Sequence, residues 1–141
     1  MSPGHLARGL VVTLALAPVL LGLGACESSV DRQRAMICRR AVPALAPPDT
    51  EIRLLRIGAG ATPDEIRVDY AVAAGRPGQA ARQRWVSCRF GPGAELLGLA
   101  TEGGPVNGAR LFLLRQYYLD TPEAAAGDPG AQKAPADHAA P

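Results

Sequence analysis

Two segments of alternating polarity constrain the fold of this chain most strongly. In residues 65–73 the apolar Ile66, Val68, Tyr70 and Val72 are expected to face one way, and the charged Glu65, Arg67 and Asp69 the other. Residues 82–90, RQRWVSCRF, place Val86 and Cys88 in the same alternating way. A period of two is typical of a β-strand that buries one face. We therefore expect two strands, separated by a turn at Arg76-Pro77-Gly78.

The two strands are expected to pair as a hairpin with a defined register. Symmetric closure about Pro77 brings apolar side chains together on one face and opposite charges together on the other. The predicted partners are Val68 with Val86, Ile66 with Cys88, and Glu65 with Arg89.

The rest of the chain predicts helices on either side of these strands. The expected elements are a helix over residues 30–41, capped by Ser28 or Ser29 and ending by residue 46, strands over 51–57 and 95–101, and a helix over 105–119. This order predicts the fold class α+β: a small two-layer domain with an N-terminal helix, a three- or four-stranded antiparallel sheet and a C-terminal helix.

Each expected helix has an apolar face at spacings of three and four residues. In the first helix this face carries Ala35, Cys38, Val42 and Leu45. In the second it carries Leu111, Leu114 and Tyr118, widened by Leu113 and Tyr117.

The first 25 residues have the layout of an export signal. Arg8 precedes an apolar stretch from Leu10 to about Leu23, and small residues follow. Pro18 and Gly22 interrupt this stretch, which is shorter than the roughly 20 residues that a transmembrane helix needs. We expect a cleaved signal and not a permanent transmembrane helix.

The segment Leu23-Gly24-Ala25-Cys26 resembles the lipobox of bacterial lipoproteins, in which small residues precede a cysteine that is acylated before the signal is cut. The resemblance covers the signal only. It implies diacylglycerol on the Cys26 sulfur, usually a third acyl chain on its amino group, and lipid anchoring on the periplasmic side of the cell membrane or outer membrane. The alternative is an ordinary secretory signal cut near Ala25, which leaves Cys26 a plain thiol.

The predicted organisation is a lipoprotein signal peptide over residues 1–25, the α+β domain over 26–119 and a tail over 120–141. The tail is rich in Ala, Pro and Gly and has no large apolar residue, so we expect it to be disordered.

The chain has three cysteines, an odd number for an exported protein. When lipid occupies Cys26, Cys38 and Cys88 remain as an even pair in an oxidising compartment. We therefore expect a Cys38–Cys88 disulfide. The alternative is two buried free thiols.

The charge of the expected domain is mildly basic. Residues 27–119 hold 13 arginines against 9 acidic residues, a net charge of +4. The arginines are scattered among strand residues, whereas nucleic-acid binding requires a dense basic face. We expect no nucleic-acid partner, and we expect the arginines to lie on solvated strand faces or near anionic lipid headgroups.

The residue types of the expected domain do not favour catalysis. The two histidines are His5, in the signal, and His138, in the tail, and the single lysine is Lys133. A Ser-His-acid triad, a Schiff-base lysine and a zinc site therefore lack their residues. We expect no enzyme activity, no metal and no cofactor.

Two places are candidate contact sites. Trp85 is expected to point outward beside Arg67 and Arg89, where an aromatic ring flanked by arginines marks a protein or lipid contact. The alternative is that Trp85 fills a partly covered second face of the sheet. Gly103 and Gly104 precede the second expected helix, where backbone N–H groups and Arg110 are a candidate anion site; plain helix initiation is the alternative.

Residues 38 to about 130 resemble a small exported segment found beside, or fused ahead of, branched-chain amino-acid transporter permeases. RWVSCRF and GLATEGGPVNGARLFLLRQYYLDTPEAAAGDPG carry this resemblance. It implies an accessory role near a transporter and assigns no residue to substrate binding.

The leading hypothesis from the sequence is a non-enzymatic lipoprotein that faces the periplasm and contacts an envelope or transporter protein. The alternative is an accessory or solute-binding component of a branched-chain amino-acid ABC transporter. An enzyme ranks third, because it would need a free reactive thiol at Cys38 or Cys88.

Overall fold

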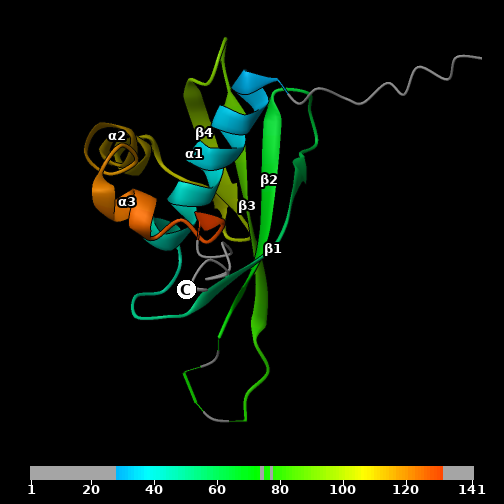
Figure 1. The fold of residues 1–141 in the computed structure, drawn as a ribbon, viewed down its shortest axis with the longest axis vertical. Coiled ribbons are helices and arrows are strands. Elements are labelled where there is room, and N and C mark those ends of the chain that lie inside the picture. The colour runs from blue at the N-terminus through cyan, green and yellow to red at the C-terminus, as the bar shows by residue number, and fades with distance from the viewer. Residues whose placement is uncertain (1–27, 74, 77, 132–141) are drawn as a thin grey trace, which may run out of the picture.

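The computed structural model describes residues 28–73, 75–76 and 78–131. Its elements are the helices α1 (Ser29–Leu45), α2 (Gly108–Tyr117) and α3 (Pro122–Ala126) and the strands β1 (Ile52–Ala59), β2 (Glu65–Val72), β3 (Arg82–Phe90), β4 (Leu96–Thr101) and β5 (Gly104–Pro105). The strands form one antiparallel sheet in the order β1-β2-β3-β4-β5. The helices lie on one side of the sheet (Figure 1). The predicted small α+β domain is confirmed.

The β2–β3 hairpin has the predicted register. Ile66 pairs with Cys88, and one face of β2 is buried at Val68, Tyr70 and Val72. The two other predicted partners, Val68 with Val86 and Glu65 with Arg89, also face each other. The hairpin extends beyond the helical layer, at the end of the sheet opposite the start of α1 (Figure 1).

Strand β1 contains an irregularity where the sequence breaks its alternation. Leu54 and Leu55 are consecutive apolar residues, and the pairing with β2 shifts between Leu54 and Arg56. A β-bulge of this kind leaves one residue unpaired and bends the strand. Leu55 is therefore turned outward and exposed, and β1 runs two residues further than expected, to Ala59.

Helix α1 begins at its predicted cap. The Ser28 side chain accepts a hydrogen bond from the backbone N–H of Asp31, at 3.0 Å, which satisfies one free donor of the first turn. The predicted face is buried at Ala35, Cys38 and Val42 and packs on β2 and β3. Pro43 lies inside the helix but in its last turn.

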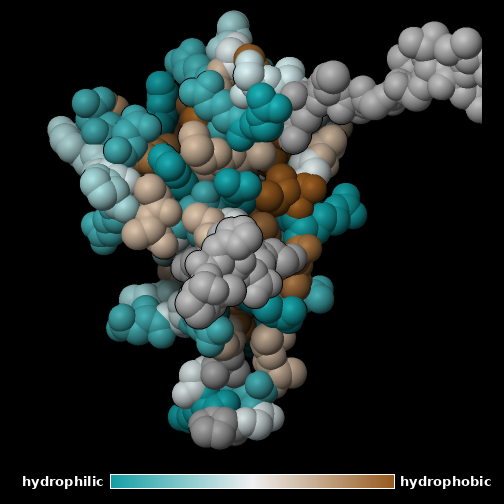
Figure 2. All heavy atoms as spheres, in the orientation of Figure 1, coloured by the Kyte–Doolittle hydropathy of each residue, from teal (hydrophilic) through white to brown (hydrophobic). Residues whose placement is uncertain are grey.

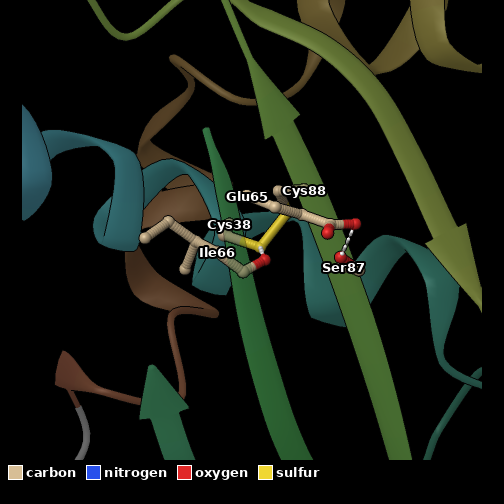
Figure 3. Close-up of a disulfide and its surroundings, with 5 residues drawn as sticks. All are labelled: Cys38, Glu65, Ile66, Ser87 and Cys88. Atoms are coloured by element: carbon tan, nitrogen blue, oxygen red, sulfur yellow. Dashed lines mark hydrogen bonds between the residues drawn. A yellow bond between two sulfur atoms is a disulfide. The ribbon is translucent and has the colours of Figure 1, made fainter. Parts of the chain in front are cut away.

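The Cys38–Cys88 disulfide lies in the middle of the core and joins α1 to the central strand β3. The Cα atoms of the two cysteines are 5.8 Å apart, within the usual range for a disulfide. Figure 3 shows the bond between α1 and the sheet, next to Ile66. Both cysteines are completely buried, together with Val42, Val68 and Val86. Helix periodicity, strand register and cysteine count therefore agree on one pairing.

The segment after β4 differs from the expectation. Pro105 does not start a helix: Gly104 and Pro105 form the short edge strand β5, which pairs with Thr101 and Ala100 of β4. Gly104 has a φ of 104°, a conformation that glycine adopts without strain and that turns the chain back onto β4. Helix α2 starts three residues later, where the Asn107 side chain accepts from the backbone N–H of Arg110 at 2.9 Å.

Residues 120–131 correct the prediction of a disordered tail that begins at residue 120. Helix α3 starts with a Thr121 cap and Pro122 in its first turn, and it buries Ala124 completely, packing on α1. Asp128, 3% exposed, accepts two hydrogen bonds from the Arg39 side chain of α1, at 2.9 and 3.1 Å. Small side chains and one ion pair are enough to hold this segment, although its composition is typical of disorder. Residues 132–141 lie outside the described residues.

Candidate functional site

The face of the sheet opposite the helices carries the predicted contact surface around Trp85. Trp85 lies on β3 directly opposite Asp69 of β2. The Arg67 guanidinium carbon lies 4.5 Å from the centroid of the Trp85 ring, and Arg67 Nε donates to an Asp69 carboxylate oxygen at 3.0 Å. The carboxylate thus holds the guanidinium over the ring in a cation–π arrangement. We call Arg67, Asp69 and Trp85 the Trp85 cluster.

Arg89 lies on the same face but outside the Trp85 cluster. It is exposed, four residues along β3 from Trp85, and it pairs across the sheet with Glu65. Its guanidinium lies over Gly98 of β4, where an added Cβ would be 3.5 Å from the Arg89 nitrogens. At about 3.3 Å per strand residue, the separation along β3 is about 13 Å. Arg67 and Trp85 therefore form one contact, and Arg89 is a separate charge on the same face.

Glu65 holds the start of β2, directly opposite Arg89. One carboxylate oxygen accepts from the Ser87 hydroxyl, as Figure 3 shows, and the other accepts from the backbone N–H of Ala61 at 2.9 Å. The Ser87 hydrogen bond, which stabilises the carboxylate form, is the main cause of the lowered pKa of Glu65. A general acid at neutral pH requires the opposite shift. The geometry of Glu65 therefore suits a structural role.

The helix start on which the candidate anion site was based is not at Gly103 and Gly104. Gly103 and Gly104 lie in the turn between β4 and β5 and not at the start of a helix. Arg110 lies on α2, and its guanidinium donates to the Ala44 carbonyl at the end of α1, at 2.9 Å. The glycine-rich turn serves to reverse the chain, and Arg110 ties α2 to α1.

Helix α2 exposes apolar side chains that the sequence analysis assigned to the core. Leu113 and Tyr117, expected to widen the buried stripe, are 55% and 67% exposed, and Phe112 is 58% exposed. The rings of Phe112 and Tyr117 meet edge to face, with centroids 6.4 Å apart. We call Phe112, Leu113 and Tyr117 the α2 apolar patch. Its signal was in the sequence: Leu111 to Leu114 are four consecutive apolar residues, which span too much of a helix to face one side.

A hollow of about 540 Å³ lies between α1 and β1. Its apolar lining includes Met36 of α1, Ile57 of β1 and Ile66 of β2. Figure 2 shows hydrophobic side chains gathered where α1 borders these strands. The hollow is open to solvent, whereas small-solute sites enclose most of the ligand surface. This shape suits the surface of a macromolecule better than a small solute.

Of the remaining predicted residues, two have a structural role and one lies outside the described residues. Cys38 and Cys88 form the disulfide described above, and Cys26 lies outside the described residues. Within residues 28–73, 75–76 and 78–131, no helix is long and apolar enough to cross a bilayer. The same residues contain no group of three or more His, Cys, Asp or Glu side chains placed to hold a metal ion.

Comparisons of the chain with protein-family models, with curated proteins and with solved structures found no match.

Proposed function

We propose that this chain is a lipid-anchored, non-enzymatic module that faces the periplasm and binds another protein of the cell envelope. The observation that carries the proposal is Leu23-Gly24-Ala25-Cys26, which resembles a lipobox, at the end of an apolar stretch and before the polar Glu27-Ser28-Ser29. Each buried methylene of an acyl chain contributes about 0.8 kcal/mol, so two or three chains hold a protein durably on a bilayer.

The disulfide supports export of the domain. Disulfides persist in the periplasm and are rare in the bacterial cytosol. With lipid on Cys26, the bond between Cys38 and Cys88 leaves no cysteine of the chain as a free thiol. The pairing also favours a non-enzymatic role, because the thiol-dependent enzyme considered from the sequence needs one of these two sulfurs free.

The open face of the sheet supports a protein contact. Tryptophan and arginine are enriched among the residues that dominate binding energies, because they combine a large apolar surface with directed hydrogen bonds. In the Trp85 cluster the arginine is already held over the ring by Asp69, so little side-chain freedom remains to be lost on binding. The mature segment from residue 27 to residue 131 also contains neither histidine nor lysine, which limits the catalytic chemistry available to it.

The anchor is tested by blocking the lipoprotein signal peptidase with globomycin in cells that express the full chain. We expect a lipidated, uncleaved precursor to accumulate, and the mature protein of untreated cells to partition into the detergent phase of Triton X-114. Cys26→Ser is the matched control: it lacks the acylated sulfur and should lose both responses. An unchanged band under globomycin would refute lipidation.

The protein contact is tested separately with a photoreactive phenylalanine analogue in living cells. At position 85 we expect cross-linking to another envelope protein, and Arg67→Ala should reduce it because the ring loses its partner. Gln83, two residues along the same strand and exposed, is the control position. Equal cross-linking at positions 83 and 85 would argue against a specific contact at Trp85.

A further inference from the structure

We infer that the α2 apolar patch is a second membrane contact, lying in the headgroup layer of the same anionic bilayer that holds the acyl chains of Cys26. This inference rests on the proposed lipid anchor and adds to it an orientation for the domain. The patch needs an occupant, because three large apolar side chains on one short helix are more than isolated surface residues.

The composition of α2 fits a bilayer interface. Leu114 on the inner side of the helix is buried against the domain, while Phe112, Leu113 and Tyr117 face away from it. Helices that lie in the interface place Phe and Leu toward the acyl chains, and tyrosine rings favour the headgroup level. Figure 1 shows α2 at the outer side of the helical layer, and α2 packs on β4.

Two arginines border the α2 apolar patch and give it the charge that anionic phospholipid attracts. Arg110 precedes the patch, and Arg115 lies between Leu113 and Tyr117 in the sequence. Arg115 is 44% exposed and makes one contact of 3.3 Å with Glu95, so its guanidinium remains accessible to solvent. Lipid phosphates are the complementary partner for such a border.

The last turn of α2 and the first half of α1 contact the same β3–β4 turn, whereas Arg110 in the first turn of α2 contacts Ala44 at the end of α1. Arg34, in the first half of α1, donates to the carbonyls of Gly91 and Gly93 in the β3–β4 turn, at 3.0 and 2.6 Å. Arg115 of α2 reaches Glu95, directly after that turn. Figure 1 shows the start of α1 and this turn together at one end, and the tip of the β2–β3 hairpin at the other.

The distance between the anchor and the folded domain is short. Cys26 precedes Ser29, the first residue of α1, by three residues. At no more than about 3.6 Å per residue, this segment can span at most about 11 Å. The bilayer that holds Cys26 is therefore close to the end of the domain that carries the β3–β4 turn, where Arg115 in the last turn of α2 contacts Glu95.

A lipid surface fits the patch better than a second copy of the chain. A specific protein interface buries about 800 Å² on each partner, more than three side chains supply. A contact that is too weak to form from solution can form when an anchor holds the two surfaces close together. Lipid on Cys26 would hold the α2 apolar patch at a high local concentration next to the bilayer.

The test uses the lipidated full chain, purified from cells and reconstituted into vesicles of phosphatidylglycerol and phosphatidylethanolamine. Leu113→Cys introduces a labelling site in the patch, and Leu55→Cys, on the exposed bulge of β1, is the matched control. Each variant is labelled with a thiol-reactive nitrobenzoxadiazole dye. Cys38 and Cys88 are bonded to each other, so one dye per chain is expected when Cys26 carries lipid.

We expect the dye at position 113 to shift to shorter wavelength, brighten several-fold and be quenched by spin-labelled lipid, while the dye at position 55 stays in water. Neutral phosphatidylcholine vesicles should weaken the response at position 113, because the arginines lose their phosphate-rich partner. Adding Tyr117→Ser to Leu113→Cys should also weaken it, without disturbing the core.

Two results would overturn the inference with the anchor intact. Equal responses at positions 113 and 55 would show that α2 does not touch lipid. A response at position 113 that depends on protein concentration in detergent, without vesicles, would assign the patch to a second copy of the chain. Two dyes per chain would instead reveal a free Cys26, which refutes the anchor and the tethered geometry together.

Discussion

Reducing the disulfide between Cys38 and Cys88 is expected to lower the free energy of unfolding by about 4 kcal/mol. The two cysteines are 50 residues apart, and for a loop of this size the chain-entropy relation gives about 14 cal/mol/K, or about 4 kcal/mol at 25 °C. Reduction leaves both sulfur atoms in the core, so this figure contains the loop term without a cavity. Domains of this size are stable by about 5–15 kcal/mol, so the bond is a large share of the total.

The assay is equilibrium unfolding in urea of a chain that starts at residue 27, with and without a phosphine reductant. Trp85, the sole tryptophan, reports the loss of the sheet, and far-ultraviolet circular dichroism reports the loss of the helices. Since the m-value of such a domain is about 1–2 kcal/mol/M, the midpoint should fall by about 2–4 M. The urea midpoint of the double variant with Cys38→Ala and Cys88→Ala should fall at least as far, because the substitutions also remove two buried sulfur atoms. The midpoint of this variant should not change with reductant.

A difference below about 1 kcal/mol between oxidised and reduced protein would refute the reasoning. It would mean that the reduced unfolded chain has no more conformational entropy than the cross-linked unfolded chain.

Three further predictions concern polar and close contacts outside the disulfide. The hydrogen bond from Ser87 lowers the pKa of Glu65 below its ordinary 4.5, so the contribution of Glu65 to stability is complete above about pH 4.5 and is lost as pH falls through the lower pKa of the folded state. Ser87→Ala should therefore reduce the loss of stability on acidification, measured by urea titration at about pH 3–6. An unchanged pH profile would contradict this prediction. Asp128→Asn should cost about 1–3 kcal/mol and raise hydrogen exchange in α3, because the Arg39 ion pair at the buried carboxylate is lost; unchanged exchange would mean that Ala packing alone holds the helix. Gly60→Ala should destabilise by about 1–3 kcal/mol, since its Cβ would lie 2.7 Å from Glu65 Cγ, and a melting temperature equal to wild type would show that β2 adjusts freely.

The sequence predicted the centre of the fold because two independent signals met there. Alternation in β2 and β3 set the register that pairs Ile66 with Cys88, and helical spacing turned Cys38 toward the same face. A register slip by one residue would have moved every apolar side chain of the hairpin to the other face, so burial of one face permits a single pairing.

The sequence failed where one pattern had two physical interpretations. Gly103-Gly104-Pro105 fits the start of a helix as well as a tight turn, and the positive φ of Gly104 decides for the turn. Residues 120–131 look disordered by composition, yet Thr121-Pro122-Glu123 is a helix start whose small Ala124 fits tightly against α1. A prediction of disorder from composition depends on the number of large apolar residues, and it misses segments that are held by close packing of small ones.

The α2 apolar patch was missed for a different reason. The widest apolar stripe of an amphipathic helix is normally the buried one, so Leu113 and Tyr117 were assigned to the core. The domain offers α2 contact on one side only, through residues such as Leu114, and the second apolar side remains outside. Where local pattern and packing disagree in this way, a binding surface is a common explanation.

The covalent link between α1 and β3 also decides how the domain would carry a mechanical load. Tension applied between the proposed anchor at Cys26 and the far end of the chain would pass from α1 into β3 through the sulfur–sulfur bond. β1, β2 and most of β3 lie inside the closed loop, so about 170 Å of extended chain, at about 3.4 Å per residue, is shielded from stretching. Such a pull would separate α2 from β4 and α3 from α1, and it would leave the β2–β3 hairpin intact.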